Sequence, residues 1–185
     1  SEIRDQKKSN TRVFIVTGGR EKGKTTFVKK TAEELKGNKI HVGGILAERV
    51  MHEQETTGYD LVDIESGKRE VFLRQHEESW QEKIGRFRIS PEGLEFGTAI
   101  LDKCNRDRNR LVIIDEIGML ELDNKGWAPA LASLLLSQAK WIMITIRDDF
   151  AEAVINKWNI SDPVIFKVPE ADPREACEKI LGEII

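Results

Sequence analysis

A phosphate-binding loop is the clearest chemical feature of this sequence. Residues 18–25 read GGREKGKT and fit the pattern G-x-x-x-x-G-K-[ST]. Such a glycine-rich turn aims backbone N–H groups at one point, and the N-terminus of the following helix adds partial positive charge there. Lys24 would reach the β- and γ-phosphates of a nucleotide, and the hydroxyl of Thr25 would ligate Mg²⁺. The loop therefore predicts a site for a nucleoside triphosphate with Mg²⁺ as cofactor.

The sequence on either side supports this loop. An apolar run at 13–16 predicts a buried strand before it, and a helical pattern runs from Thr25 to Lys36 behind it. An ordinary glycine-rich turn between strand and helix is the alternative interpretation. The predicted nucleotide-binding residues are Gly18, Gly19, Arg20, Glu21, Lys22, Gly23, Lys24, Thr25 and Thr26.

A pair of adjacent acids completes the predicted site. Asp115 and Glu116 directly follow the apolar run 111–114. An aspartate at the end of a buried strand reaches the Mg²⁺ beside a phosphate loop, usually through water. A glutamate beside it can act as a general base on the water that attacks the γ-phosphate. We expect Asp115 near the metal and Glu116 as the catalytic base, whereas acids at strand ends also occur without such roles.

Three further polar residues follow predicted strands at the same edge. Arg147 could stabilise charge in the transition state, and Thr145 could contact the γ-phosphate. The alternatives are a surface cation and a residue that only favours strands. Glu48 is a candidate second acid at the metal, because ligands bind at the carboxyl edge of open α/β sheets. A surface salt bridge is the alternative for Glu48.

Strands alternating with helices predict an α/β fold: a P-loop NTPase (RecA-like) domain with a mostly parallel sheet flanked by helices. Residues 49–90 break the alternation, because runs at 59–64 and 69–74 flank a Ser-Gly turn and predict an antiparallel hairpin insertion. We expect one domain over 11–185 and a disordered lead-in or tag remnant at 1–10. Fold analogy places the strand before the phosphate loop in the middle of the sheet.

Composition excludes several classes of function. The net charge of −3 and the interspersed charges argue against nucleic-acid binding, and no apolar run reaches the length of a membrane span. No export signal is visible, so Cys104 and Cys177 are expected as reduced thiols in the cytoplasm. The histidines lack the spacing of metal ligands. The sequence does not predict a protein partner.

Three elements occur in the order and spacing of a known family. They are the loop 18–25, Thr57-Gly58-Tyr59, and the run 115–122 with the pattern D-E-I-G-x-x-E-L. Over about residues 12–185 the sequence resembles the small P-loop nucleoside-triphosphatase family. The resemblance implies Mg²⁺-dependent hydrolysis of nucleoside triphosphates to diphosphate and phosphate, with broad base tolerance. It also implies the roles stated above for Lys24, Thr25, Asp115 and Glu116.

The sequence departs from the family pattern at three positions. Glu21 stands where the family loop usually has glycine, Met119 where it has lysine, and Thr56 where it has arginine. These changes bear on turnover and substrate choice more than on nucleotide binding. Two other functions therefore remain open. One is a nucleoside or small-molecule kinase, although no arginine-rich lid is visible, and the other is a nucleotide-binding adaptor with residual hydrolysis.

Overall fold

The computed structural model describes residues 13–20, 23–107, 111–137 and 141–184. The predicted lead-in at 1–10 and the loop residues Glu21 and Lys22 lie outside these ranges. The described strands are β1 (Val13–Gly18), β2 (Val42–His52), β3 (Glu55–Asp63), β4 (Arg69–Arg74), β5 (Lys83–Ile84), β6 (Phe87–Ile89), β7 (Leu111–Ile114), β8 (Trp141–Arg147) and β9 (Val164–Lys167). The described helices are α2 (Lys24–Gly37), α3 (Pro91–Arg106), α4 (Met119–Leu122), α5 (Ala128–Leu136), α6 (Asp148–Lys157) and α7 (Pro173–Ile184). None of the helices in the described ranges has both the length and the apolar character needed to cross a bilayer.

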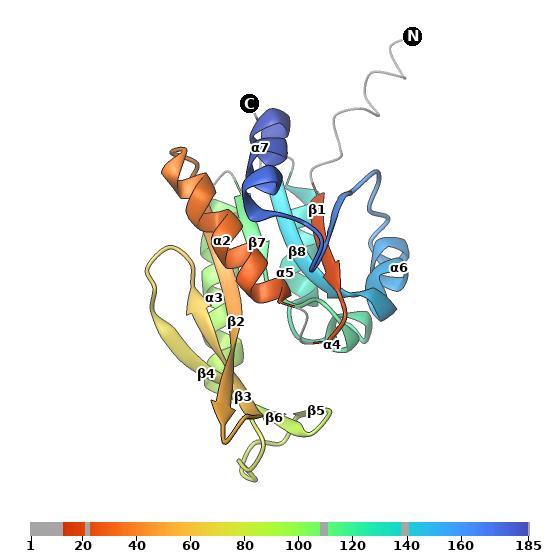
Figure 1. Ribbon diagram of the computed structural model, residues 1–185. Coiled ribbons are helices and arrows are strands. Elements are labelled where there is room, and N and C mark those ends of the chain that lie inside the picture. The colour runs from red at the N-terminus through yellow and green to blue at the C-terminus, as the bar shows by residue number, and fades with distance from the viewer. Residues whose placement is uncertain (1–12, 21–22, 108–110, 138–140, 185) are drawn as a thin grey trace.

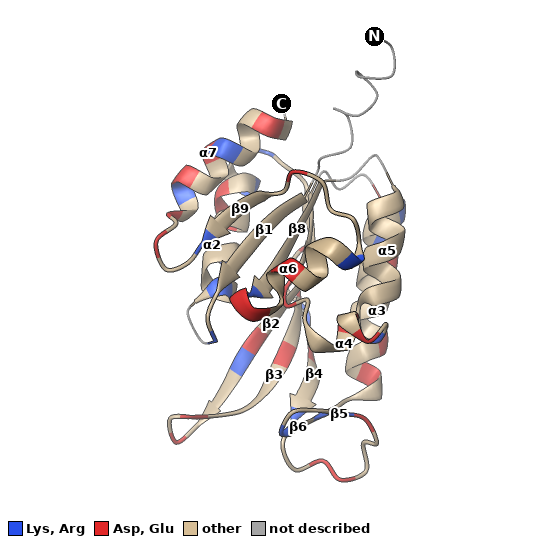
Figure 2. Ribbon diagram, turned by 90° about the vertical axis from the view of Figure 1, so that its right-hand side faces the viewer, with Lys and Arg blue, Asp and Glu red and all other residues tan. Residues whose placement is uncertain are grey.

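The strands form one sheet in the order β5-β6-β4-β3-β2-β7-β8-β1-β9. Strands β2, β7, β8, β1 and β9 pair in parallel, and all residues of β1 and β7 are buried. Apolar residues cover both faces: α2 and α7 pack on one, and α3, α5 and α6 on the other (Figure 2). The predicted α/β architecture with a mostly parallel core is confirmed.

The position of β1 differs from the expectation. The strand lies second from one end, between β8 and β9. It is off-centre because the antiparallel strands β3 to β6 all extend the sheet on the far side of β2. Strand β8 intervenes between β1 and β7, so it separates the strand before the phosphate loop from the strand before the two acids.

The antiparallel insertion is confirmed and contains one more hairpin than predicted. The expected hairpin is β3–β4, and the expected third strand is β6. An additional hairpin joins β2 to β3 through Glu53 and Gln54, both with positive φ. Together β2 and β3 extend well beyond the helices, at the carboxyl end of the parallel strands (Figure 1). Strand β2 pairs with β7 of the parallel core and with β3 of the insertion, so the insertion extends the core sheet.

Gly44 is a point where the parallel core depends on glycine. Its φ is 117°, and a Cβ atom there would lie 2.0 Å from the carbonyl oxygen of Ile113 on β7. We expect Gly44→Ala to lower the free energy of unfolding by about 2 kcal/mol or more, through backbone strain and overpacking. Gly37→Ala is the control, since a Cβ there meets no atom within 4 Å. Denaturant unfolding measures the stability of both variants. Equal stabilities would contradict this prediction.

Candidate active site

The parallel strands bring three sequence-distant segments to one edge of the sheet. Gly18 ends β1 and is in register with Arg147 of β8, while Ile114 at the end of β7 is in register with Ile144 of the same strand. The phosphate loop, the acids after β7 and the polar end of β8 are therefore neighbours. The register therefore brings the ends of β1, β7 and β8, with the predicted site residues next to them, to this edge.

Asp115 is the buried centre of this group. The residue is 2 % exposed, its Oδ2 accepts the Thr25 hydroxyl at 2.7 Å and the Ala47 amide at 2.9 Å, and its Oδ1 accepts the Thr145 hydroxyl at 2.7 Å. Burial raises the pKa of the carboxyl group, and these hydrogen bonds only partly oppose that rise. Carboxylate and hydroxyl oxygens are the ligand types that Mg²⁺ prefers. The Thr25–Asp115 pair therefore fits a Mg²⁺ ion.

The side chain of Lys24 contacts the backbone at the start of the phosphate loop. Its Nζ donates to the carbonyl oxygens of Gly19 at 2.9 Å and Gly18 at 3.3 Å. Burial lowers the pKa of this ammonium group, against the opposing charges of Glu116 and Asp115. Gly23, before the helix, has a φ of 85°, a conformation that favours glycine. The ammonium group thus lies against the backbone of the two residues that begin the loop.

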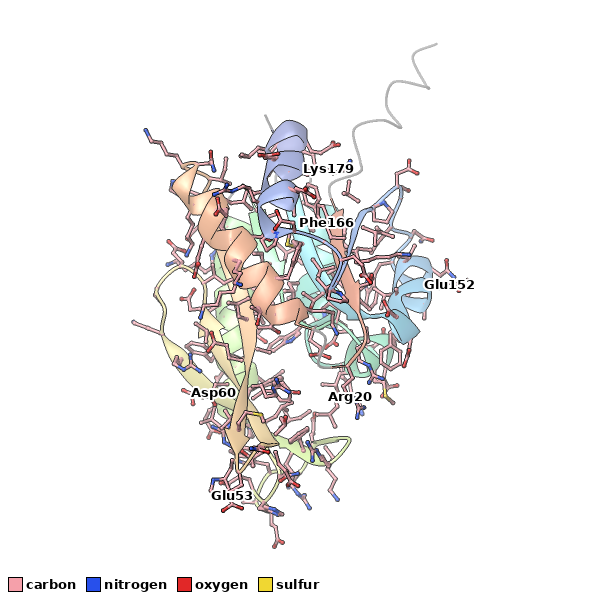
Figure 3. The ribbon with its side chains drawn as sticks, viewed as in Figure 1. Arg20, Glu53, Asp60, Glu152, Phe166 and Lys179 are labelled. Carbon is pink, nitrogen blue, oxygen red and sulfur yellow. The ribbon has the colours of Figure 1, made fainter. Side chains whose placement is uncertain are left out.

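Other residues of the loop are more open. Figure 3 places Arg20 at the carboxyl end of β1, and the residue is exposed. Thr26 is exposed on the first turn of α2. Of the family departures, Met119 is 64 % exposed at the start of α4 and Thr56 is buried in β3.

Glu116 has an unusual backbone conformation. Its φ is 74°, in the left-handed region that side chains with a Cβ rarely adopt. Partial burial of its carboxyl group and the negative charge of Asp115 raise the pKa of Glu116, against the positive charges of Lys24 and Arg147. The residue remains exposed, so solvent screens these effects. Glu116 therefore combines access to water with a position near Lys24.

Arg147 lies at the same edge, and its guanidinium group contacts Asp149 and the ring of Phe150. Nη2 contacts Asp149 Oδ2 at 3.0 Å, and the guanidinium carbon lies 5.2 Å from the ring centre of Phe150. The ion pair is at the surface, where such contacts are weak. A negative ligand could therefore draw Arg147 away from Asp149.

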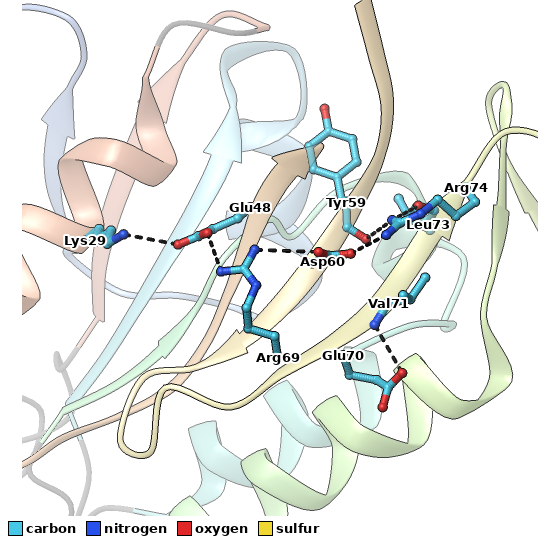
Figure 4. A network of polar contacts seen from close by, with 9 residues as sticks. All are labelled: Lys29, Glu48, Tyr59, Asp60, Arg69, Glu70, Val71, Leu73 and Arg74. Atoms are coloured by element: carbon cyan, nitrogen blue, oxygen red, sulfur yellow. Dashed lines mark hydrogen bonds and ion pairs between the residues drawn. The ribbon is translucent and has the colours of Figure 1, made fainter. Parts of the chain in front are cut away.

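Glu48 is engaged in ion pairs with two cations. Its carboxylate contacts Lys29 of α2 at 3.3 Å and Arg69 of β4 at 2.7 Å, in a network that continues to Asp60 and Arg74 (Figure 4). Burial alone would raise the pKa of Glu48, but the hydrogen bonds from Arg69 and Lys29 outweigh it and the pKa is lowered. The salt-bridge interpretation describes Glu48, and we do not include it among the proposed metal ligands.

Glu121 is a buried acid to which the sequence interpretation assigned no role. The residue is 3 % exposed; Oε1 accepts the Gly118 amide at 2.8 Å and Oε2 accepts the Trp127 amide at 2.9 Å. A Cβ at Gly126 would lie 2.1 Å from Oε2. The carboxylate thus closes the loop that follows Glu116. The sequence signals were its place in the D-E-I-G-x-x-E-L run and an acid among apolar residues between Gly118 and Gly126.

The burial of Glu121 predicts a pH-dependent stability. Burial raises the pKa of its carboxyl group from 4.5 to about 7. The folded chain therefore holds this proton more tightly than the unfolded chain does. The protonated carboxyl group contributes its full stabilisation of the fold below pH 4.5, and this stabilisation is lost as the pH rises through about 7. At 1.36 kcal/mol per pKa unit, the loss is about 3 kcal/mol.

The variant Glu121→Gln removes this proton and leaves Asp115 and Glu116 in place. We expect the free energy of unfolding of the wild-type chain, relative to that of the variant, to fall between pH 4.5 and 7. Denaturant unfolding at a series of pH values measures this difference. Parallel pH profiles for the two proteins would show that Glu121 does not titrate in this way.

Comparison with known proteins fits this geometry. The sequence profile of the NTPase family matches residues 13–181. The chain belongs to the NTPase family. The nucleoside-triphosphatase THEP1 of Archaeoglobus fulgidus is 32% identical over 154 residues, which cover 78% of this chain and 89% of that protein. THEP1 of Thermofilum pendens is 32% identical over 136 residues, covering 73% of each chain.

Solved structures show the same fold as this NTPase. The solution structure of a human cancer-related nucleoside triphosphatase has a TM-score of 0.71 and 23% identity, covering 94% of this chain and 97% of that one. The crystal structure of THEP1 from Aquifex aeolicus has a TM-score of 0.73 and 24% identity, covering 93% and 98%. The family resemblance inferred from the three sequence elements is confirmed.

Proposed function

We propose that this NTPase hydrolyses nucleoside triphosphates to the diphosphate and phosphate, with Mg²⁺ and with broad base tolerance. The observation that carries the proposal is the 2.7 Å hydrogen bond between Thr25 and Asp115, which are 90 residues apart. It joins the phosphate loop to the pair of acids in one site. The printed name of the archaeal relatives, nucleoside-triphosphatase, supports the same activity.

In the proposed mechanism, the loop amides and Lys24 bind the phosphates of the nucleotide. Mg²⁺, held by Thr25 and Asp115, would offset negative charge on the β- and γ-phosphate oxygens. Glu116 orients a water molecule and accepts its proton while the water oxygen bonds to the γ-phosphorus. The bond between that phosphorus and the bridging oxygen breaks, and the nucleoside diphosphate leaves with the electron pair. Arg147 stabilises charge on the transferred group once it has left Asp149.

The alternatives differ from this proposal in what receives the phosphoryl group. A kinase would transfer it to an acceptor other than water, and an adaptor would bind nucleotide with negligible turnover. An exposed Glu116 favours water as the acceptor, because solvent reaches the proposed base. The relatives' printed activity also disfavours a kinase. A cytoplasmic location remains a prediction, made because the sequence shows no export signal.

The proposed function is tested by phosphate release from ATP, GTP, CTP and UTP, with Mg²⁺ or with EDTA. We expect release from all four nucleotides with Mg²⁺ and none with EDTA. Chromatography should detect the diphosphate and phosphate as sole products. Nucleotide binding without release would contradict the proposal and favour the adaptor, whereas release that requires an added alcohol or nucleoside acceptor would favour the kinase.

A further inference from the structure

Three consecutive backbone amides after Asp115 are all hydrogen bonded. The Glu116 amide donates to the Thr145 hydroxyl oxygen at 2.6 Å, and the Ile117 amide donates to the Thr145 carbonyl oxygen at 2.9 Å. The Gly118 amide donates to Glu121 Oε1 at 2.8 Å. Thr145 therefore holds the first two of these amides, one with its side chain and one with its main chain.

This anchoring counteracts the backbone strain at Glu116. A φ of 74° is disfavoured for a residue with a Cβ atom, and such conformations persist where surrounding contacts enforce them. Glu116 comes directly after a buried strand and is itself exposed, so little packing restrains its side chain. Among the described contacts, the hydrogen bond to the Thr145 hydroxyl is the one made by the Glu116 amide itself.

The Thr145 hydroxyl has no proton left to donate to a phosphate oxygen. It has one proton, which it donates to Asp115 Oδ1 at 2.7 Å, while its oxygen accepts the Glu116 amide. The residue is fully buried. A contact with the γ-phosphate would require this proton to leave Asp115. The hydroxyl instead joins the proposed metal ligand to the proposed base in one hydrogen-bonded chain.

We infer that Thr145 is a positioning residue whose hydroxyl holds Glu116 in its left-handed conformation and orients Asp115. This inference rests on the proposed function, in which Glu116 is the general base. Thr145 would then govern the turnover number and leave nucleotide affinity nearly unchanged. Affinity is preserved because Asp115 Oδ2 keeps its contacts with Thr25 and Ala47, and because Lys24 is untouched.

The test compares Thr145→Val, which keeps the shape of the side chain without its hydroxyl, with Thr145→Ser, which keeps the hydroxyl. We expect Thr145→Val to lower kcat about 10- to 100-fold, the usual range for a lost supporting hydrogen bond. KM should change less than about threefold, and Thr145→Ser should restore most of kcat. Equal losses in both variants would overturn the inference, as would a change in KM alone or a Thr145→Val variant as active as wild type.

A double-mutant cycle separates a role through Glu116 from a direct contact with substrate. In a Glu116→Gln background, Thr145→Val should cause a smaller loss of kcat than in the wild-type background, because only its effect on Asp115 remains. An undiminished second loss would mean that Thr145 acts independently of Glu116, and would overturn the inference.

Amide hydrogen exchange provides a readout that needs no activity. We expect the Glu116 amide to be protected in wild type and in Thr145→Ser, and to exchange at least tenfold faster in Thr145→Val or, if that variant does not fold, in Thr145→Ala. Unchanged protection would overturn the inference. A wild-type protein that protects the Glu116 amide in this Thr145-dependent way but hydrolyses no nucleotide would instead contradict the proposed function and leave the anchoring contact established.

Discussion

Glu116→Gln should lower the rate of phosphate release by about 10²- to 10⁴-fold, the usual contribution of a general base. Glutamine has nearly the same shape as glutamate but cannot accept the proton of water. The backbone amide that donates to Thr145 is unaffected, so the turn at residue 116 should persist. Removing a negative charge beside Lys24 should leave nucleotide affinity equal to wild type or slightly higher.

Phosphate release under saturating nucleotide measures this effect, and nucleotide titration measures affinity. Glu178→Gln is the matched control, because Glu178 is exposed on α7, which packs on a face of the sheet and contributes no residue to the carboxyl-edge site. The control should retain wild-type turnover. Wild-type turnover in Glu116→Gln would rule out Glu116 as the base, and it would favour the adaptor hypothesis only if that turnover were negligible in both proteins.

Lys24→Ala should lower kcat/KM for every nucleotide by about 10²- to 10³-fold, the scale for removing one donor to a charged transition state. Lys24 is the one described cation whose Nζ contacts both the Gly18 and Gly19 carbonyls. Without it, the phosphates keep only the loop amides and the metal. Unlike the loss from Glu116→Gln, this loss should include weaker nucleotide binding.

Lys30→Ala is the control for this substitution, because Lys30 is exposed on the same helix and lies beyond the loop. Calorimetric titration with a nonhydrolysable triphosphate separates binding from turnover. Comparable affinities in Lys24→Ala and wild type would contradict a phosphate-binding role for Lys24.

Local sequence patterns were enough to predict the parallel core and several of the residues that meet at its carboxyl edge. Each of two patterns spans fewer than ten residues. One is a lysine and a hydroxyl after a glycine-rich turn, and the other is two acids after an apolar run. Parallel strands put their carboxyl ends on one edge, so the meeting of Thr25 with Asp115 follows from fold class. The same reasoning predicted the β3–β4 hairpin from its Ser-Gly turn.

Only the tertiary structure decided how the polar side chains are paired. Whether Glu48 meets a metal or a cation depends on where α2 and β4 lie beside β2, and the partners Lys29 and Arg69 are 19 and 21 residues away. The left-handed Glu116 and its anchor Thr145 depend on the register between β7 and β8. The burial of Glu121 depends on the loop that returns at Trp127. Short-range periodicity shows which faces of the helices and strands are apolar. Hydrogen-bond geometry and desolvation are set by distant chain segments. Hydrogen bonding and desolvation in turn determine the charge and direction of each group in the site.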